Sequence, residues 1–364
     1  MYRKIMGFLE AWKENEHRKP LILQGARQVG KTYSILEFGR IHYENVAYFN
    51  FETNPKLNET FEEKISPDYL IPILSHIAGQ TIVKEKTLIV FDEVQLCERA
   101  LTSLKYFCED APDYHIIVAG SLLGVAVNRA KFSFPVGKVD MKTLYPMDME
   151  EFMIAVGEDE LVEQIKKCFE TNRPMPSALH DAAMQLYRQY LVVGGMPECV
   201  MQFVQTGDYI LIRHTQDTIL TSYLNDMSKY NNLNAIKKTR LAYDNITVQL
   251  SKKNTRFQYN LIKKGGRASE FENAIEWLCL SGIASQVYRV EQIKKPLENY
   301  RDIDAFKIYV SDLGLLCAKK DLAANDILYM VEELNDFKGG MTENYVNVQL
   351  AINGYNTYYW ESER

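Results

Sequence analysis

The sequence predicts a layered α/β fold in its first 150 residues, with a parallel sheet covered by helices on both faces. Short apolar runs alternate there with longer amphipathic segments, and the runs are continuously apolar rather than alternating. The segments between them are long enough for crossover helices, as a layered fold of this kind requires. A composition of 46% hydrophobic and 25% charged residues over 364 positions excludes a disordered chain.

The strands are expected in four apolar runs, at 20–24, 46–51, 87–91 and 115–119. From Asp148 the pattern becomes helical, with apolar residues at helical spacing over 149–171 and 177–205 and a proline-marked break at 172–176. Beyond about residue 235, short helices precede two strand-like runs, at 283–290 and 306–310. The chain is therefore expected to continue from the α/β part into a helical part and then a mixed part.

A glycine-rich loop follows the first predicted strand, with the pattern G-x-x-x-x-G-K-[ST] in GARQVGKT, residues 25–32. In this pattern the loop N–H groups and the next helix N-terminus bind phosphate, Lys31 contacts the β/γ oxygens, and Thr32 ligates Mg²⁺. The alternative is a strand-to-helix turn with an exposed lysine, but the flanking strand and helix are those that a phosphate loop requires. The residues expected to contact ATP are Gly25, Ala26, Gln28, Val29, Gly30, Lys31, Thr32 and Tyr33.

The third predicted strand, 87–91, ends in the adjacent carboxylates Asp92 and Glu93. Because a buried strand that ends this way needs cations nearby, the pair suits a site that holds Mg²⁺. Asp92 is expected to hold the metal through its water shell, and Glu93 to orient and deprotonate the water that attacks the γ-phosphate. The alternative is that both carboxylates are solvated and cap the following helix.

The fourth predicted strand, 115–119, is followed by Gly120 and Ser121. A small polar side chain at this strand end is placed to hydrogen-bond the γ-phosphate or the attacking water, which makes Ser121 a candidate catalytic residue. A turn serine or a helix N-cap is an equally good interpretation of the same position.

Composition also limits where in the cell the protein is expected and which partners it is expected to bind. The six cysteines lie far apart, without a C-x-x-C pair or a zinc spacing, which predicts free thiols in a reducing compartment. No apolar run approaches the roughly 20 residues that cross a bilayer, and the first segment lacks the apolar core of a signal peptide. A net charge of −6 argues against a protein that coats nucleic acid wholesale. We therefore predict a cytoplasmic protein with no membrane association.

Together these motifs resemble a known family, the prokaryotic AAA-plus ATPases that carry a C-terminal domain of unknown function. The resemblance runs nearly end to end and is carried by GARQVGKT, LIVFDEVQ, AGSLLG, FPVGKVDMKTLYPMDMEEF, YLVVGGMPECV, KIYVSDLGLL, TENYVNVQL and YYW. It implies a P-loop ATPase core at 1–147, a helical lid at 148–234, a winged helix at 235–315 and the start of a nuclease-like domain at 316–364.

Two positions depart from the family pattern. Lys138 stands where relatives usually have arginine, and a lysine lacks the planar, bidentate group that a sensor or finger residue uses. Glu343 matches one acid of a nuclease-type metal site, but the sequence stops before the remaining ligands, so the chain is either truncated or never had this activity. Because metal-assisted cleavage needs several converging oxygen ligands, the simpler interpretation is that Glu343 starts an amphipathic helix.

A local basic stretch lies between residues 236 and 267, where Asp244 is the single anion. Its cations are Lys237, Lys238, Arg240, Lys252, Lys253, Arg256, Lys263, Lys264 and Arg267. The stretch coincides with a helix-turn-helix-like run at 259–281, and such a patch can supply DNA affinity through phosphate contacts. Acidic residues on the second helix, Glu270, Glu272 and Glu276, oppose base readout, so the alternative is a solvated basic face or a winged helix that docks a protein.

The sequence therefore predicts an enzyme that binds ATP and hydrolyses it with Mg²⁺. Three classes of function stay open. The first is hydrolysis that remodels a protein or nucleic-acid partner, the second is a slow nucleotide-controlled switch or DNA-binding regulator, and the third is the ATPase part of a nuclease system. The partner is accordingly DNA, another protein or a second copy of the chain.

Overall fold

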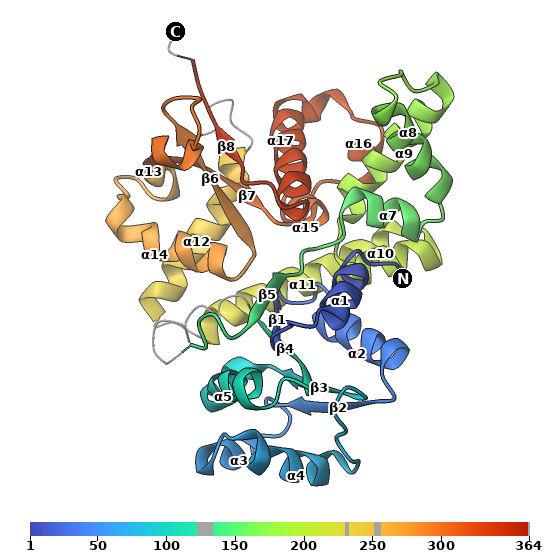
Figure 1. The fold of residues 1–364 in the computed structure, drawn as a ribbon. Coiled ribbons are helices and arrows are strands. Elements are labelled where there is room, and N and C mark those ends of the chain that lie inside the picture. Colours follow the sequence, from blue (N-terminus) through green and yellow to red (C-terminus); the bar gives the residue numbers. More distant parts are fainter. Residues whose placement is uncertain (122–133, 230–232, 251–255, 363–364) are drawn as a thin grey trace. The chain divides into compact units, whose positions relative to one another are not determined.

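The computed structural model describes residues 1–121, 134–229, 233–250 and 256–362 (Figure 1). They form two compact units: an N-terminal unit, Arg3–Leu144, and a C-terminal unit, Tyr145–Arg364 together with Met1–Tyr2. Each unit contains its own sheet, five-stranded in the first and three-stranded in the second.

The sheet of the N-terminal unit is entirely parallel, with the strand order β2-β3-β4-β1-β5. Its strands are β1 (Leu21–Gly25), β2 (Asn45–Asn50), β3 (Thr87–Asp92), β4 (His115–Ser121) and β5 (Asp140–Thr143). The first four confirm the predicted strands, and every residue of β3 is buried. The sequence analysis missed β5, because its residues Asp-Met-Lys-Thr contain no apolar run.

One helix precedes the first strand, and the others lie between the strands. They are α1 (Ile5–Glu14), α2 (Lys31–His42), α3 (Leu57–Glu63), α4 (Pro67–Ala78), the 3₁₀ turn η1 (Val94–Leu96) and α5 (Glu98–Asp110). Part of the core is an aromatic cluster of Phe51, Phe61 and Phe91, whose ring centroids lie 5.6–5.9 Å apart in edge-to-face geometry. The layered α/β fold is thus confirmed.

The C-terminal unit begins with helices, as predicted. They are α7 (Met149–Ala155), α8 (Asp159–Glu170), α9 (Ser177–Val193), α10 (Pro197–Thr206) and α11 (Tyr209–Lys229). The segment 149–171 forms two helices rather than one, because Gly157 adopts a left-handed φ of 85° between them. The segment 177–205 is likewise interrupted, at the glycine pair before Pro197.

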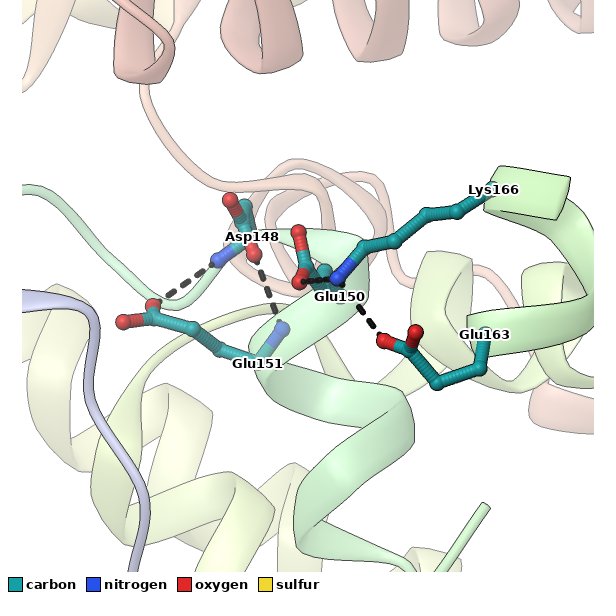
Figure 2. Close-up of polar contacts among 5 residues, drawn as sticks. All are labelled: Asp148, Glu150, Glu151, Glu163 and Lys166. Carbon is teal, nitrogen blue, oxygen red and sulfur yellow. Dashed lines mark hydrogen bonds and ion pairs between the residues drawn. The ribbon is translucent and has the colours of Figure 1, made fainter. Parts of the chain in front are cut away.

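Local polar contacts fix the start of this helical region (Figure 2). The Asp148 carboxylate accepts a hydrogen bond from the Glu151 N–H at 2.8 Å, and the Glu151 carboxylate accepts one from the Asp148 N–H at 3.3 Å. This reciprocal pair is a capping box that starts α7. Lys166 on α8 lies between Glu150 and Glu163, at 2.9 and 3.1 Å, and thereby links α8 to α7.

The rest of the C-terminal unit mixes helices with its small sheet. In chain order it contains α12 (Leu233–Leu250), α13 (Tyr259–Ile262), α14 (Ala268–Leu280), β6 (Ala284–Val290), η2 (Leu297–Tyr300), β7 (Arg301–Val310), α15 (Leu313–Lys319), α16 (Ala324–Leu328), η3 (Glu332–Leu334), α17 (Asn335–Ile352) and β8 (Tyr358–Tyr359). β6 pairs antiparallel with β7 and parallel with β8.

Glu343 lies within α17 and not at its start, so the helix-start interpretation is wrong. The helix begins at Asn335 and continues through the glycine pair that precedes Glu343. The Glu343 carboxylate pairs with Lys307 of β7 at 2.5 Å. Within the described ranges, no helix combines the length and apolar character needed to span a membrane.

Candidate nucleotide-binding site

The strand order brings the predicted site residues of the N-terminal unit to the carboxyl edge of the sheet. β4 lies between β1, which leads into the glycine-rich loop, and β3, which ends in Asp92. The backbone of Ser121, at the end of β4, is paired with Gly25. The Ser121 side chain lies outside the described residues, so its predicted role stays a prediction. Ligands of open parallel sheets bind at this edge.

Two glycines give the loop its shape. A Cβ atom at Gly25 would lie 2.2 Å from the Leu144 carbonyl oxygen, so only glycine fits where the loop leaves β1. Gly30 adopts a left-handed φ of 89° immediately before α2, which starts at Lys31. The chain therefore turns sharply from β1 into α2, and the free N–H groups at the start of α2 face the loop.

The Lys31 side chain is folded over this loop. Its ammonium group donates hydrogen bonds to the carbonyl oxygens of Gly25 at 3.0 Å and Ala26 at 2.8 Å. Burial lowers the pKa of Lys31 to about 8, although the carboxylates of Glu93 and Asp92 oppose this shift. The ammonium group is thus held against the main chain of the glycine-rich loop.

The Asp92 carboxylate is the polar centre of the site. One of its oxygens accepts hydrogen bonds from the Thr32 hydroxyl at 2.9 Å and from the Tyr48 hydroxyl at 2.7 Å. The other accepts the Glu93 N–H at 3.0 Å. The hydroxyl of Thr32 and the carboxylate of Asp92 are hard oxygen donors held side by side, so the pair suits Mg²⁺.

Tyr48 is a residue that sequence reasoning missed. It lies on β2, next to β3 in the sheet, and its hydroxyl also accepts a hydrogen bond from Asn50 at 3.1 Å. Burial raises the pKa of Tyr48 to about 12, so it donates to Asp92 as a neutral phenol at neutral pH. The only available signal was an aromatic hydroxyl near the end of a strand, and the neighbour of that strand is known only from the sheet order.

Glu93 follows Asp92 in an uncommon backbone conformation. Its φ is 52°, in the left-handed region that non-glycine residues rarely occupy and that is often found at functional sites. The Gln95 side-chain amide donates a hydrogen bond to the Glu93 carboxylate. The half-buried carboxylate is therefore held close to Asp92 and Lys31.

The comparison with protein families agrees with this geometry. The AAA domain family matches residues 17–153, a range that includes the glycine-rich loop and both carboxylates. The chain carries an AAA-plus P-loop ATPase domain. Residues 184–326 match a domain of unknown function, DUF8612. No curated relative matches the chain.

Solved structures resemble the chain at low sequence identity. The Walker-type ATPase PABY2304 of Pyrococcus abyssi is 14% identical, with a TM-score of 0.52 over 88% of this chain and 95% of that one. A RuvB variant of Thermotoga maritima is 14% identical, with a TM-score of 0.35 over 79% and 88%. Cdc6p of Pyrobaculum aerophilum is 14% identical, with a TM-score of 0.27 over 90% and 92%. The first likeness supports the fold, and the other two are too distant to support a conclusion.

The remaining loop residues of the ATPase domain fall into two groups. Ala26 and Val29 are buried, at 4% and 0% exposure, so they are available to a nucleotide through their backbone. Gln28 and Tyr33 are exposed. Lys138, the position that departs from the family pattern, pairs with Glu109 on the surface at 2.9 Å.

The predicted basic stretch is partly neutralised within the C-terminal unit. Lys263 pairs with Glu270 at 3.5 Å, which neutralises its charge. Arg240 keeps its charge and donates a hydrogen bond to the Ser228 hydroxyl at 3.1 Å. Lys252 and Lys253 lie outside the described residues. Lys237 and Lys238 lie on α12 without an ion-pair partner among the described residues.

Proposed function

We propose that the ATPase domain binds ATP with Mg²⁺ and hydrolyses it. The observation that supports this most directly is that Lys31, Thr32 and Asp92, from the two predicted motifs, meet at one edge of the sheet. Thr32 and Asp92 would hold Mg²⁺, which supplies positive charge to the phosphates, and Lys31 would bind the β/γ oxygens.

Glu93 is the proposed general base. It takes a proton from water as the water oxygen forms a bond to the γ-phosphorus, and the bond from that phosphorus to the β–γ bridging oxygen breaks. Its fixed position, with a φ of 52° and a hydrogen bond from Gln95, supports this role. The products are ADP and inorganic phosphate.

Phosphate release and nucleotide binding test the assignment together. We expect Lys31→Ala to abolish tight ATP binding, and Glu93→Gln to keep binding while losing turnover by about a hundredfold or more. Glu98→Gln, at the start of α5, is the matched control and should behave as wild type. Equal turnover in Glu93→Gln and wild type would contradict the general-base role.

We further propose that hydrolysis is coupled to DNA through residues 235–315. The three helices α12, α13 and α14, followed by the antiparallel pair β6 and β7, have the element order of a winged helix. The basic stretch supports phosphate contacts, and the acids on α14 argue against base readout. The four-part division at 147, 234 and 315, and a cytoplasmic location, stay predictions.

The same phosphate-release assay tests this coupling when duplex DNA is added at two salt concentrations. Stimulation that fades as salt rises would support DNA coupling, because counterion release makes phosphate contacts salt-dependent. Slow turnover indifferent to DNA would favour the alternative, a nucleotide-controlled switch that responds to a protein partner or to a second copy of the chain.

A further inference from the structure

The N-terminal helix α1 lies against α2, the helix that follows the glycine-rich loop (Figure 1). Its apolar residues Ile5, Leu9 and Trp12 are buried. Near the end of α1, the Lys13 ammonium donates a hydrogen bond to the carbonyl oxygen of His42, the last residue of α2, at 2.8 Å. These contacts fix α1 beside α2, so the chain just before α1 is held in place as well.

Arg3 connects this part of the chain to the loop itself. Its guanidinium Nη1 donates a hydrogen bond to the carbonyl oxygen of Val29 at 3.0 Å. Arg3 is 5% exposed and Val29 is fully buried, and both belong to the N-terminal unit. Because a buried carbonyl group cannot bond to water instead, the guanidinium group supplies a partner that the loop requires.

This hydrogen bond fixes the orientation of the peptide group between Val29 and Gly30. In a trans peptide, the C=O of one residue and the N–H of the next point in opposite directions. The Val29 carbonyl points to Arg3, so the Gly30 N–H points to the other side of the peptide, away from Arg3. Gly30 has a φ of 89° and no Cβ atom to restrain it, so a contact from outside the loop is what keeps this peptide from rotating.

We propose that Arg3 is a positioning residue for nucleotide binding, an inference that rests on the function proposed above. Arg3 is buried and donates to the main chain, so it does not itself touch the nucleotide. It holds the peptide between Val29 and Gly30 so that the Gly30 N–H points to the β-phosphate that the loop binds. A donor that is oriented before the ligand arrives binds it more tightly, because less order has to be imposed on binding.

Binding of ADP with Mg²⁺ to the full chain tests this role without requiring hydrolysis. Arg3→Met keeps a long apolar stem and removes the donor. ADP affinity should then fall about tenfold or more, since the hydrogen bond from Gly30 to a charged phosphate oxygen is weakened. Arg3→Gln, whose shorter side chain also loses the contact, is the second variant and carries the same expectation. Lys13→Met is the matched control: it removes the contact of α1 with the far end of α2 and should bind ADP as wild type does.

The Gly30 amide signal provides a readout that a general loss of stability would not change. Four glycines follow a valine in the sequence: Gly30, Gly137, Gly157 and Gly194. Valine labelled with ¹³C at the carbonyl and glycine labelled with ¹⁵N therefore restrict the spectrum to four amide signals. Val29→Ile removes the signal of Gly30 from this set and so identifies it. ADP should shift the Gly30 signal saturably in wild type, and should shift it less at saturation in Arg3→Met.

The outcomes separate this inference from the proposed function. If wild type binds ADP and the two Arg3 variants bind it equally well, the positioning role is overturned and the nucleotide site stands. The role is also overturned if Lys13→Met loses as much affinity as the Arg3 variants. It is overturned again if ADP binds to wild type without moving the Gly30 signal, a test that needs neither variant to fold. If wild type does not bind ADP at all, the proposed function fails and the positioning role fails with it.

Discussion

At the residue scale, the proposed nucleotide site is centred on one carboxylate that three hydrogen bonds hold in place. Asp92 is 5% exposed and accepts hydrogen bonds from Thr32 on α2, Tyr48 on β2 and the main chain of Glu93. These contacts fix the orientation of a proposed metal ligand before nucleotide arrives. Tyr48 and the main chain of Glu93 would not touch the metal, but partners of this kind influence metal affinity by orienting the ligand.

Tyr48→Phe tests this positioning role. The ring is kept and the hydrogen bond to Asp92 is lost, so the Mg²⁺ concentration for half-maximal ATP hydrolysis should rise about tenfold. Tyr69→Phe removes a hydroxyl that contacts Glu63 on the surface and should leave the Mg²⁺ dependence unchanged. A Mg²⁺ midpoint in Tyr48→Phe equal to that of wild type would show that the hydroxyl has only a structural role.

A second prediction at this scale concerns His115, the first residue of β4. Burial, followed by the charges of Arg18 and Lys13, lowers the pKa of His115 to about 4, and Tyr43 contacts its Nδ1 at 2.7 Å. The folded state therefore binds fewer protons than the unfolded state between about pH 6.5 and 4. Stability should fall by about 2–3 kcal/mol as pH drops through this range.

Denaturant unfolding at pH 7 and pH 4.5 measures this effect. His115→Gln keeps an acceptor for the Tyr43 hydroxyl but does not titrate, so the variant should lose less stability on acidification than wild type. His17→Gln, at an exposed position, should follow wild type. Identical acid dependence in His115→Gln and wild type would show that His115 does not couple to folding.

At the scale of elements, two segments far apart in the sequence meet at Asp312. This buried residue caps α15, where one carboxylate oxygen accepts the Leu315 N–H at 2.8 Å. The other accepts the Gly195 N–H at 2.6 Å, in the turn between α9 and α10. Burial raises the pKa of Asp312 to about 6, while these main-chain donors lower it. The Asp312 carboxylate thus connects two segments by hydrogen bonds, those with the sequences YLVVGGMPECV and KIYVSDLGLL.

Asp312→Ala is expected to destabilise the C-terminal unit by about 2–4 kcal/mol, because it leaves two buried N–H groups unpaired and removes a helix cap. Urea unfolding followed by circular dichroism measures the change. Asp159→Ala, in the exposed first turn of α8, should change stability by less than about 0.5 kcal/mol. A similarly small change in Asp312→Ala would show that water replaces the carboxylate.

At the scale of the whole molecule, the two compact units differ in how much of their secondary structure could be predicted from the sequence. The four central strands of the N-terminal unit follow from continuous apolar runs, because a strand buried on both faces must be apolar along its length. β5 has no such run and was missed. In the C-terminal unit, Gly157 interrupts a helical pattern that apolar spacing alone predicted to continue.

The sequence by itself determined the parallel α/β fold and pointed to the glycine-rich loop and the acidic pair, because strand burial, loop turns and the proposed phosphate chemistry each require particular residue types within a short segment. Only the tertiary structure decided which strands are neighbours, and therefore that Tyr48 reaches Asp92 and that Asp312 joins two distant turns. Contacts between distant segments depend on packing, and packing has no local signature in the sequence.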